Sequence, residues 1–188
     1  SGKSFSTAKV IEQIAGLAKG NAILFDIHNE YQPLTEEDGI VRLKVASPSD
    51  VEKKLSLQDG VIYLPFWLLG YEDIIAMLVD RSDQNAPNQA MLMSRTINEA
   101  KQEALSTTGH KDVLANFTID SPVPYSLDVV INKLKFFDTE RIDGARAGTE
   151  KNGDFNGKLS RLIARVENKQ SDRRLGFLFC KNEELLKY

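Results

Sequence analysis

The sequence has few of the features that mark disulfide-bonded, secreted or membrane proteins. Cys180 is the one cysteine among 188 residues, which excludes an internal disulfide and a zinc site built from several cysteines, and favours a reducing compartment. No apolar run approaches the roughly 20 residues that a bilayer-spanning helix needs. The first residues also show no basic region leading into an apolar core. We therefore expect a cytoplasmic protein with no membrane partner.

An excess of positive charge is also lacking. Lys and Arg number 24 and Asp and Glu number 27, so the formal net charge is −3 at pH 7. A chain without a global positive field cannot hold nucleic acid by neutralising phosphates over its whole surface. Contact with DNA would have to use a local basic feature or be shared among subunits. The most positive stretch is residues 157–174, which contains Lys158, Arg161, Arg165, Lys169, Arg173 and Arg174.

Apolar residues make up 41% of the sequence, which is enough to bury one or two cores of ordinary globular size. Their spacing predicts helices over residues 71–79, 87–106 and 127–137. The longest apolar stretch, residues 61–69, is broken by Pro65 and is typical of a buried strand followed by a turn or a helix start. Residues 142–157 are rich in Gly, Asn and charge, and we expect a mobile loop there.

The first four residues read Ser-Gly-Lys-Ser and lead into apolar side chains whose spacing predicts a helix over residues 5–19, ended by Gly20. Such a helix start offers a phosphate free backbone N–H groups, the positive end of the helix dipole, a lysine ammonium and a serine hydroxyl for Mg²⁺. Gly2, Lys3 and Ser4 therefore fit the second half of a P-loop. The first glycine of the full pattern would lie upstream of Ser1, so an accidental Gly-Lys-Ser in an exposed tail is the alternative.

A short apolar run, residues 22–27, follows this helix and is too short for another helix, so it predicts a fully buried parallel strand. Ligands of open α/β sheets gather at the carboxyl ends of the strands. The predicted strand ends at Asp26, and the polar side chains of His28, Glu30 and Tyr31 follow it. The sequence thus places polar groups where a nucleotide would bind.

At this point the sequence resembles the HerA-type ATPases, in the HerA and FtsK branch of P-loop NTPases. Residues 26–31, Asp-Ile-His-Asn-Glu-Tyr, are similar to the Asp-Pro-His-Gly-Glu-Tyr segment after the P-loop helix of that family, with Ile27 and Asn29 in place of proline and glycine. Residues 64–72 resemble the family's Pro-Tyr-Trp-Leu-Leu segment before a helical insertion. Residues 121–127 resemble the extended link after the insertion, and residues 172–179 the strand region where the sheet resumes.

The resemblance implies ATP and Mg²⁺ as cofactors and implies roles for single residues. Lys3 and Glu30 would take part in catalysis, and Ser4 and Asp26 would lie at the metal. Judged without the resemblance, Asp26 would cap a turn, His28 would be an ordinary loop histidine and Glu30 would be a solvated carboxylate. The residues that would bind the nucleotide are Ser1, Gly2, Lys3, Ser4, Asp26 and His28.

Motor ATPases also need an apolar strand ending in Asp-Glu, which holds the Mg²⁺ shell and orients water. The sequence contains no such motif: Glu183 and Glu184 are adjacent, but they follow Lys181 and Asn182 and do not end a strand. We therefore expect the chain to begin inside its P-loop and to stop before the Asp-Glu strand. As a fragment, it is expected to hydrolyse ATP negligibly.

The fold class that these observations predict is α/β, a RecA-like P-loop NTPase sheet formed by the ends of the chain, with an α-helical insertion. The expected division is a first part of the ATPase core over residues 1–70, a helical insertion over residues 71–138, and a loop with the return to the core over residues 139–188.

The resemblance implies an ATP-driven DNA translocase or helicase that forms a hexameric ring. Its roles would be DNA end processing beside a nuclease such as NurA, or antiviral defence with an effector partner. Arg161, Arg165, Arg173 and Arg174 would contact DNA or a neighbouring subunit's ATP, with a solvated basic face as the alternative. Two other functions remain: a small-molecule P-loop kinase, with Arg81 and Arg95 as lid arginines, and a non-catalytic interaction module.

Overall fold

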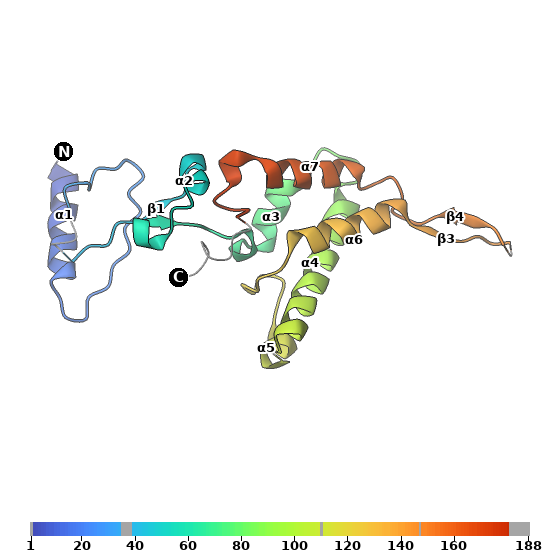
Figure 1. Cartoon of the computed structure of the whole chain (residues 1–188), viewed down its shortest axis with the longest axis horizontal. Helices are drawn as coiled ribbons and strands as arrows, with labels where there is room; N and C mark the ends of the chain where they lie inside the picture. Colours follow the sequence, from blue (N-terminus) through green and yellow to red (C-terminus); the bar gives the residue numbers. More distant parts are fainter. Residues whose placement is uncertain (1, 35–38, 110, 147, 181–188) are drawn as a thin grey trace.

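A computed structural model describes residues 2–34, 39–109, 111–146 and 148–180. The chain is elongated, with helix α1 at one end, a helical body in the middle and a β-hairpin projecting from the other end (Figure 1). The elements are α1 (Gly2–Ala15), β1 (Lys44–Val45), α2 (Pro48–Glu52), η2 (Leu57–Asp59), β2 (Val61–Ile62), η3 (Phe66–Leu68), α3 (Tyr71–Leu78), α4 (Ala86–Thr108), α5 (Lys111–Asn116), α6 (Leu127–Thr139), β3 (Arg141–Asp143), β4 (Glu150–Asn152), α7 (Ser160–Ser171) and η4 (Arg173–Leu175), where η denotes a 3₁₀-helix.

The helical body is built by α3, α4, α6 and α7, which bury their apolar faces in one core. The three helices expected from apolar spacing are confirmed. Pro87 lies in the first turn of α4, and Gly109 ends that helix with a left-handed φ of 79°. Each large apolar side chain buried here contributes about 1.5–3 kcal/mol. The most deeply buried members are Leu92, Met93, Ile97, Val130, Leu134, Leu159, Leu162 and Val166.

Helix α7 shares this core with the helices before it, and so do Leu178 and Phe179 beyond η4. Phe66 of η3 contacts the segment before α6 and the segment after η4. Its ring packs edge-on against Tyr125 and stacks on Phe179, with centroid distances of 5.1 and 5.8 Å. The division of the chain into an ATPase core and a helical insertion stays a prediction.

A second, small core surrounds a two-stranded parallel sheet in which Lys44 pairs with Val61 and Val45 with Ile62. Ala46, Val61 and Tyr63 are buried in it, and the Tyr63 hydroxyl donates to the Leu55 carbonyl at 2.9 Å. Within the described residues this is the one parallel sheet, and it is formed by segments near residues 45 and 62 rather than by the ends of the chain. The structure is therefore mixed α/β, with a smaller sheet than expected.

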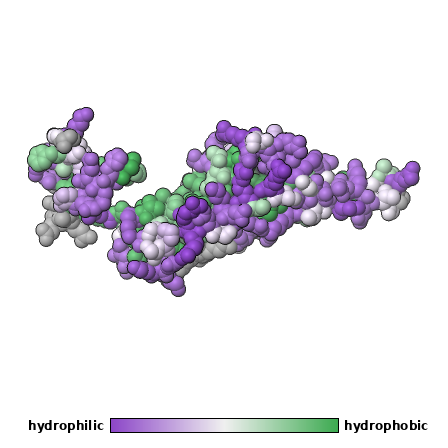
Figure 2. All heavy atoms as spheres, turned by 90° about the horizontal axis from the view of Figure 1, so that it is seen from above, coloured by the Kyte–Doolittle hydropathy of each residue, from purple (hydrophilic) through white to green (hydrophobic). Residues whose placement is uncertain are grey.

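The strand predicted over residues 22–27 is wrong for this structure, because residues 22–26 have no regular secondary structure, Ile27 lies in a turn, and the segment pairs with no strand in the described part of the chain. Ile23, Phe25 and Ile27 are 86% to 87% exposed instead of buried. A parallel strand needs a hydrogen-bonded neighbour, and apolar sequence alone cannot supply one. Figure 2 shows apolar surface in the N-terminal part of the molecule and where that part joins the helical body.

Two expectations about the end of α1 and about residues 142–157 are corrected. Helix α1 starts at Gly2 and ends at Ala15, so Gly20 does not end it; the chain turns back instead, and a Cβ on Gly20 would lie 2.6 Å from the Ile14 carbonyl oxygen. Residues 142–157 include most of an antiparallel hairpin, with Ile142 opposite Lys151, and are not a loop throughout. Its exposed polar strands lack the alternation that reveals a half-buried strand.

The region predicted to resume the sheet, residues 172–179, forms the 3₁₀-helix η4 and a turn. It still meets the extended chain after β2, because the backbone N–H groups of Leu64 and Phe66 donate to the carbonyls of Phe177 and Leu178 at 3.1 and 3.0 Å. Of the buried strand expected within residues 61–69, β2 covers only Val61–Ile62, and η3 follows it as the expected helix start. None of the helices in the described ranges is long and apolar enough to span a bilayer.

Candidate functional site

The N-terminus of α1 presents the Gly-Lys-Ser segment on an open surface. A Cβ built on Gly2 would meet nothing within 4 Å, and the Lys3 side chain is exposed. No acidic residue occupies the first turn of the helix, so its positive end is not neutralised from within. The hydroxyls of Ser6 and Thr7 bond back to the carbonyls of Gly2 and Lys3 at 2.9 and 3.1 Å. The first backbone N–H groups of an α-helix have no partner within the helix, so those of this turn can bind an anion.

The turn over residues 26–31 is built around the Asp26 carboxylate. Its Oδ1 accepts from the Glu30 backbone N–H and its Oδ2 from the Tyr31 N–H, both at 3.0 Å. Asn29 adopts a left-handed backbone with φ of 56°, a conformation that Asn tolerates better than most residues. Asn29 therefore serves the position where HerA-type ATPases have glycine, and Asp26 closes the turn.

The hydrogen bonds at this turn lower the pKa of Asp26. Partial burial acts the other way and tends to raise it, but the N–H groups of Tyr31, Glu30 and Asn29 and the nearby His28 outweigh that effect. Asp26 is therefore a carboxylate at neutral pH. Its turn-capping contacts are those expected of it without any resemblance to a family.

The side chains of Ser4 and Glu30 meet between α1 and this turn. The Ser4 hydroxyl donates to Glu30 Oε2 at 2.7 Å, across 26 residues of sequence. The Ser4 hydroxyl and the Glu30 carboxylate thus form one pair, the Ser4–Glu30 cluster. Asp26 is joined to this pair only through the Glu30 backbone N–H. Lys3 and His28 lie exposed on the two segments, and Ser1 is outside the described residues.

These oxygen atoms suit a hard cation. Mg²⁺ is usually bound by one or two protein oxygens together with substrate phosphates and water. The Ser4 hydroxyl and the Glu30 carboxylate at the start of α1 offer oxygen ligands of this kind. In the described ranges no group of three or more His, Cys, Asp and Glu side chains is arranged to hold a metal ion, and a phosphate-assisted magnesium site does not need one.

All four arginines singled out in the basic stretch are paired with carboxylates of the same chain. Arg165 and Arg161 contact Asp80 and Asp83 in the loop between α3 and α4, at 2.9 and 3.7 Å. Arg173 contacts Glu52 of α2, and Arg174 contacts Asp172 at 2.7 Å. Arg161 is the least constrained, since its side chain is 87% exposed. The partners of Arg161, Arg165 and Arg173 come from distant segments, so sequence spacing gave no sign of them, whereas Asp172 lies two residues before Arg174.

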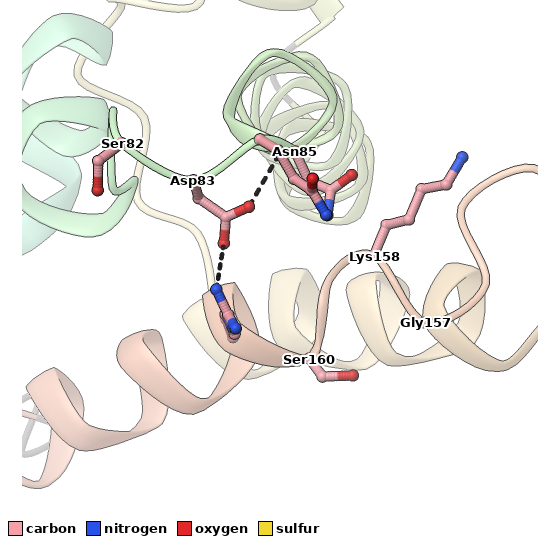
Figure 3. A pocket seen from close by; sticks show the side chains of 8 residues that line it. Ser82, Asp83, Asn85, Gly157, Lys158 and Ser160 are labelled. Atoms are coloured by element: carbon pink, nitrogen blue, oxygen red, sulfur yellow. Dashed lines mark hydrogen bonds and ion pairs between the residues drawn. The ribbon is translucent and has the colours of Figure 1, made fainter.

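A polar cavity of about 590 Å³ lies between the α3–α4 loop and the start of α7 (Figure 3). Asp83 is central to it and accepts the Asn85 backbone N–H at 2.8 Å as well as facing Arg161. The cavity is at the opposite side of the helical body from α1 (Figure 1), so it is not part of the Ser4–Glu30 cluster. Its lining residues are Ser82, Asp83, Gln84, Asn85, Gly157, Lys158, Ser160 and Arg161.

The two arginines proposed for a kinase lid do not line this cavity. Arg95 donates to Glu99 at 3.0 Å and lies over the Phe137 ring, 5.1 Å from its centroid, so it fixes α4 against α6. Arg81 is exposed in the α3–α4 loop. The kinase alternative gains no support from their contacts.

Comparison with known protein families gives a match over nearly the whole chain. The family model described as "Helicase HerA, central domain" matches residues 1–184. No curated protein matches the sequence. The match includes both the Gly-Lys-Ser helix start and the Asp26–Glu30 turn.

Proposed function

Because this chain belongs to the family of the helicase HerA central domain, we propose that it is the ATP-binding part of an ATP-driven DNA helicase or translocase. The observation that carries the proposal is the meeting of Ser4 with Glu30 at the open start of α1, beside Lys3. Family membership implies an ATPase in general. The RecA-like arrangement of the core, the hexameric ring and the DNA substrate belong to the proposal.

In the proposed site, Lys3 and the N–H groups of the first turn of α1 hold the nucleotide phosphates. Ser4 supplies an oxygen to Mg²⁺, and the Asp26 carboxylate adds negative charge near that cation. His28 lies on the same turn and faces solvent, where it can contact the nucleotide. Bound Mg²⁺ would neutralise charge on the phosphates during transfer.

The partners follow from the same proposal. A ring of identical subunits would encircle DNA. A nuclease such as NurA or a defence effector would bind the ring and act on the DNA that it translocates. The cytoplasm is the compartment that suits such work. Support comes from the family match, while the acidic net charge requires that DNA be held by local basic groups.

Replacing Lys3 with alanine tests the proposal in the full-length protein. A lysine at an exposed helix start contributes little to stability, but its charge supports phosphoryl transfer, so Lys3→Ala should lower ATP hydrolysis by about a hundredfold or more. Lys9→Ala is the matched control on the same helix, because Lys9 is also exposed and pairs with Glu12 at 2.6 Å. Wild-type hydrolysis by Lys3→Ala would remove the P-loop assignment.

Nucleotide binding separates the proposal from a non-catalytic interaction module. Isothermal titration with ATP and Mg²⁺ should show saturable binding by the wild type and the Lys9→Ala control. Absence of binding by both would favour the interaction module.

A further inference from the structure

The hydrogen bond from Ser4 to Glu30 joins the first turn of α1 to the turn over residues 26–31. Two features of the turn direct Glu30 toward the helix. Asp26 receives the Glu30 backbone N–H, Asn29 reverses the chain through its left-handed φ of 56°, and the Glu30 carboxylate then reaches Ser4 at 2.7 Å.

This contact decides how the Ser4 hydroxyl is oriented. A hydroxyl has one hydrogen and two lone pairs, and an unrestrained hydroxyl rotates freely. When its hydrogen is given to a carboxylate, the lone pairs must point elsewhere, and the oxygen becomes a fixed acceptor. Side chains that bind metals are commonly held by such an outer partner, which sets their orientation and basicity.

We propose that Glu30 is a positioning residue that fixes the Ser4 hydroxyl for the nucleotide-bound Mg²⁺. The inference rests on the proposed function and deepens it, since it assigns Glu30 to the metal through Ser4 rather than to the attacking water. The acceptor geometry of residue 30 matters in this role more than its charge. Asp26 and Asn29 contribute by holding the turn that presents it.

Two conservative substitutions separate geometry from charge. Glu30→Gln keeps the length of the side chain and an oxygen that can accept from Ser4, but removes the charge. Glu30→Asp keeps the charge, but its side chain is one methylene shorter. Its carboxylate therefore lies farther from the Ser4 hydroxyl, which is 2.7 Å from the Glu30 carboxylate in the wild type. Both changes are small at an exposed site and should leave the fold intact, which circular dichroism verifies. Glu12→Gln, at the other end of α1, is the control.

The measurement is the affinity of the full-length protein for the non-hydrolysable analogue AMP-PNP, by isothermal titration with Mg²⁺ and again with EDTA. The ratio of the two affinities reports the metal contribution and does not depend on turnover. We expect Glu30→Asp to lower this ratio about tenfold, in line with losses of outer partners at metal sites. Glu30→Gln should stay within about threefold of the wild type, and binding in EDTA should be unchanged in every variant.

A double-mutant cycle with Ser4→Ala completes the test, because a residue that acts through Ser4 must lose its effect when the hydroxyl is gone. In the Ser4→Ala background, Glu30→Asp should no longer change the ratio. A larger loss in Glu30→Gln than in Glu30→Asp, or an undiminished effect without the hydroxyl, would overturn the positioning role. If the wild type itself shows no difference between Mg²⁺ and EDTA, the proposed function fails, which is a separate result.

Discussion

The Arg165 guanidinium donates to the Asp80 carboxylate, with 2.9 Å between Nη2 and Oδ2, and so ties α7 to the loop that follows α3. The other Asp80 oxygen accepts from the backbone N–H and the hydroxyl of Ser82, at 3.0 and 2.7 Å. Asp80 is thus held in place from its own loop while it faces the arginine. Arg165 thus places its positive charge against a carboxylate of the same chain. Whether α7 can contact DNA depends on whether Arg165 can leave Asp80.

Replacing Asp80 with asparagine tests the DNA role of Arg165. If Arg165 contacts phosphates in the assembled protein, Asp80→Asn should strengthen DNA binding, because the arginine no longer has a competing carboxylate. Arg165→Ala should weaken binding uniformly across sequences and reduce the salt slope by about one. Fluorescence anisotropy over a range of salt concentrations measures both, with Glu103→Gln on the exposed side of α4 as control. Unchanged binding in both Asp80→Asn and Arg165→Ala would leave α7 as a solvated basic face.

Acid should weaken the fold through carboxylates whose pKa the structure lowers. The Ser82 hydroxyl and Arg165 lower the pKa of Asp80 to about 2, and Arg174 lowers that of Asp172 to about 2. Ser47 and Lys44 likewise hold the pKa of Asp50 below its ordinary value. A folded-state pKa below the unfolded value gives stability that is present above about pH 4 and is lost as the pH falls toward 2.

Thermal denaturation from pH 6 down to pH 2.5 checks this expectation. Asp80→Asn should be less stable than the wild type at pH 6, and the difference should shrink as the pH falls, since the Asp80 carboxylate of the unfolded wild type takes up a proton before that of the folded state does. Asp143→Asn, in the exposed hairpin, is the control and should follow the wild type at every pH. A constant difference between Asp80→Asn and wild type over this range would contradict the pKa shift.

The sequence predicts the helical body well because helices depend on local spacing. The stripe formed by Leu127, Val130, Ile131 and Leu134 repeats at helical intervals, and all four side chains are buried in α6. The strand expected at residues 22–27 could not be judged in the same way. Its apolar side chains fit a buried strand, but a strand exists only with a neighbour from elsewhere in the sequence.

In the candidate site too, the features that depend on neighbouring residues could be predicted from the sequence, and the contact between distant residues could not. Gly2, Lys3 and Ser4 were placed at a helix start from sequence alone, and α1 begins there. The resemblance singled out Asp26 and Glu30, but no pattern indicated that Ser4 and Glu30 touch. One signal was available: Asn in place of glycine is typical of a left-handed turn, and that turn is what carries Glu30 to Ser4.

Asn29 offers a direct test of the turn. Asn29→Gly should leave the metal contribution to nucleotide affinity unchanged, since glycine adopts the left-handed conformation freely. Asn29→Val should cost about 1–2 kcal/mol in that conformation and open the turn, so that Glu30 withdraws from Ser4 and the metal contribution falls. Lys54→Val is the matched control, because Lys54 is also left-handed, with φ of 55°, but lies in another turn. Equal effects of Asn29→Val and Lys54→Val on nucleotide affinity would show that strain alone matters.

The last prediction concerns Lys101, an amine buried in the helical body. Its side chain is on α4 with 1% of the residue exposed, and Nζ donates to the carbonyls of Ile119 and Ser121 at 2.5 and 2.7 Å. The same nitrogen lies over the Tyr125 ring, 5.5 Å from its centroid. Burial lowers the pKa of Lys101, while Asp120 acts in the opposite direction. The amine therefore fastens the chain between α5 and α6 to the longest helix.

Lys101→Met keeps the length and apolar stem of the side chain but leaves both carbonyls without their donor. Unsatisfied buried acceptors cost about 1–3 kcal/mol each, so the free energy of unfolding in urea should fall by about 2–4 kcal/mol. Lys133→Met is the comparison: Lys133 bonds to Glu99 at 2.9 Å but is partly exposed, and its loss should cost under about 1 kcal/mol. If both variants lose the same small free energy of unfolding, the carbonyls of Ile119 and Ser121 must bind water in Lys101→Met. Lys101 then stabilises the fold by packing rather than by its hydrogen bonds.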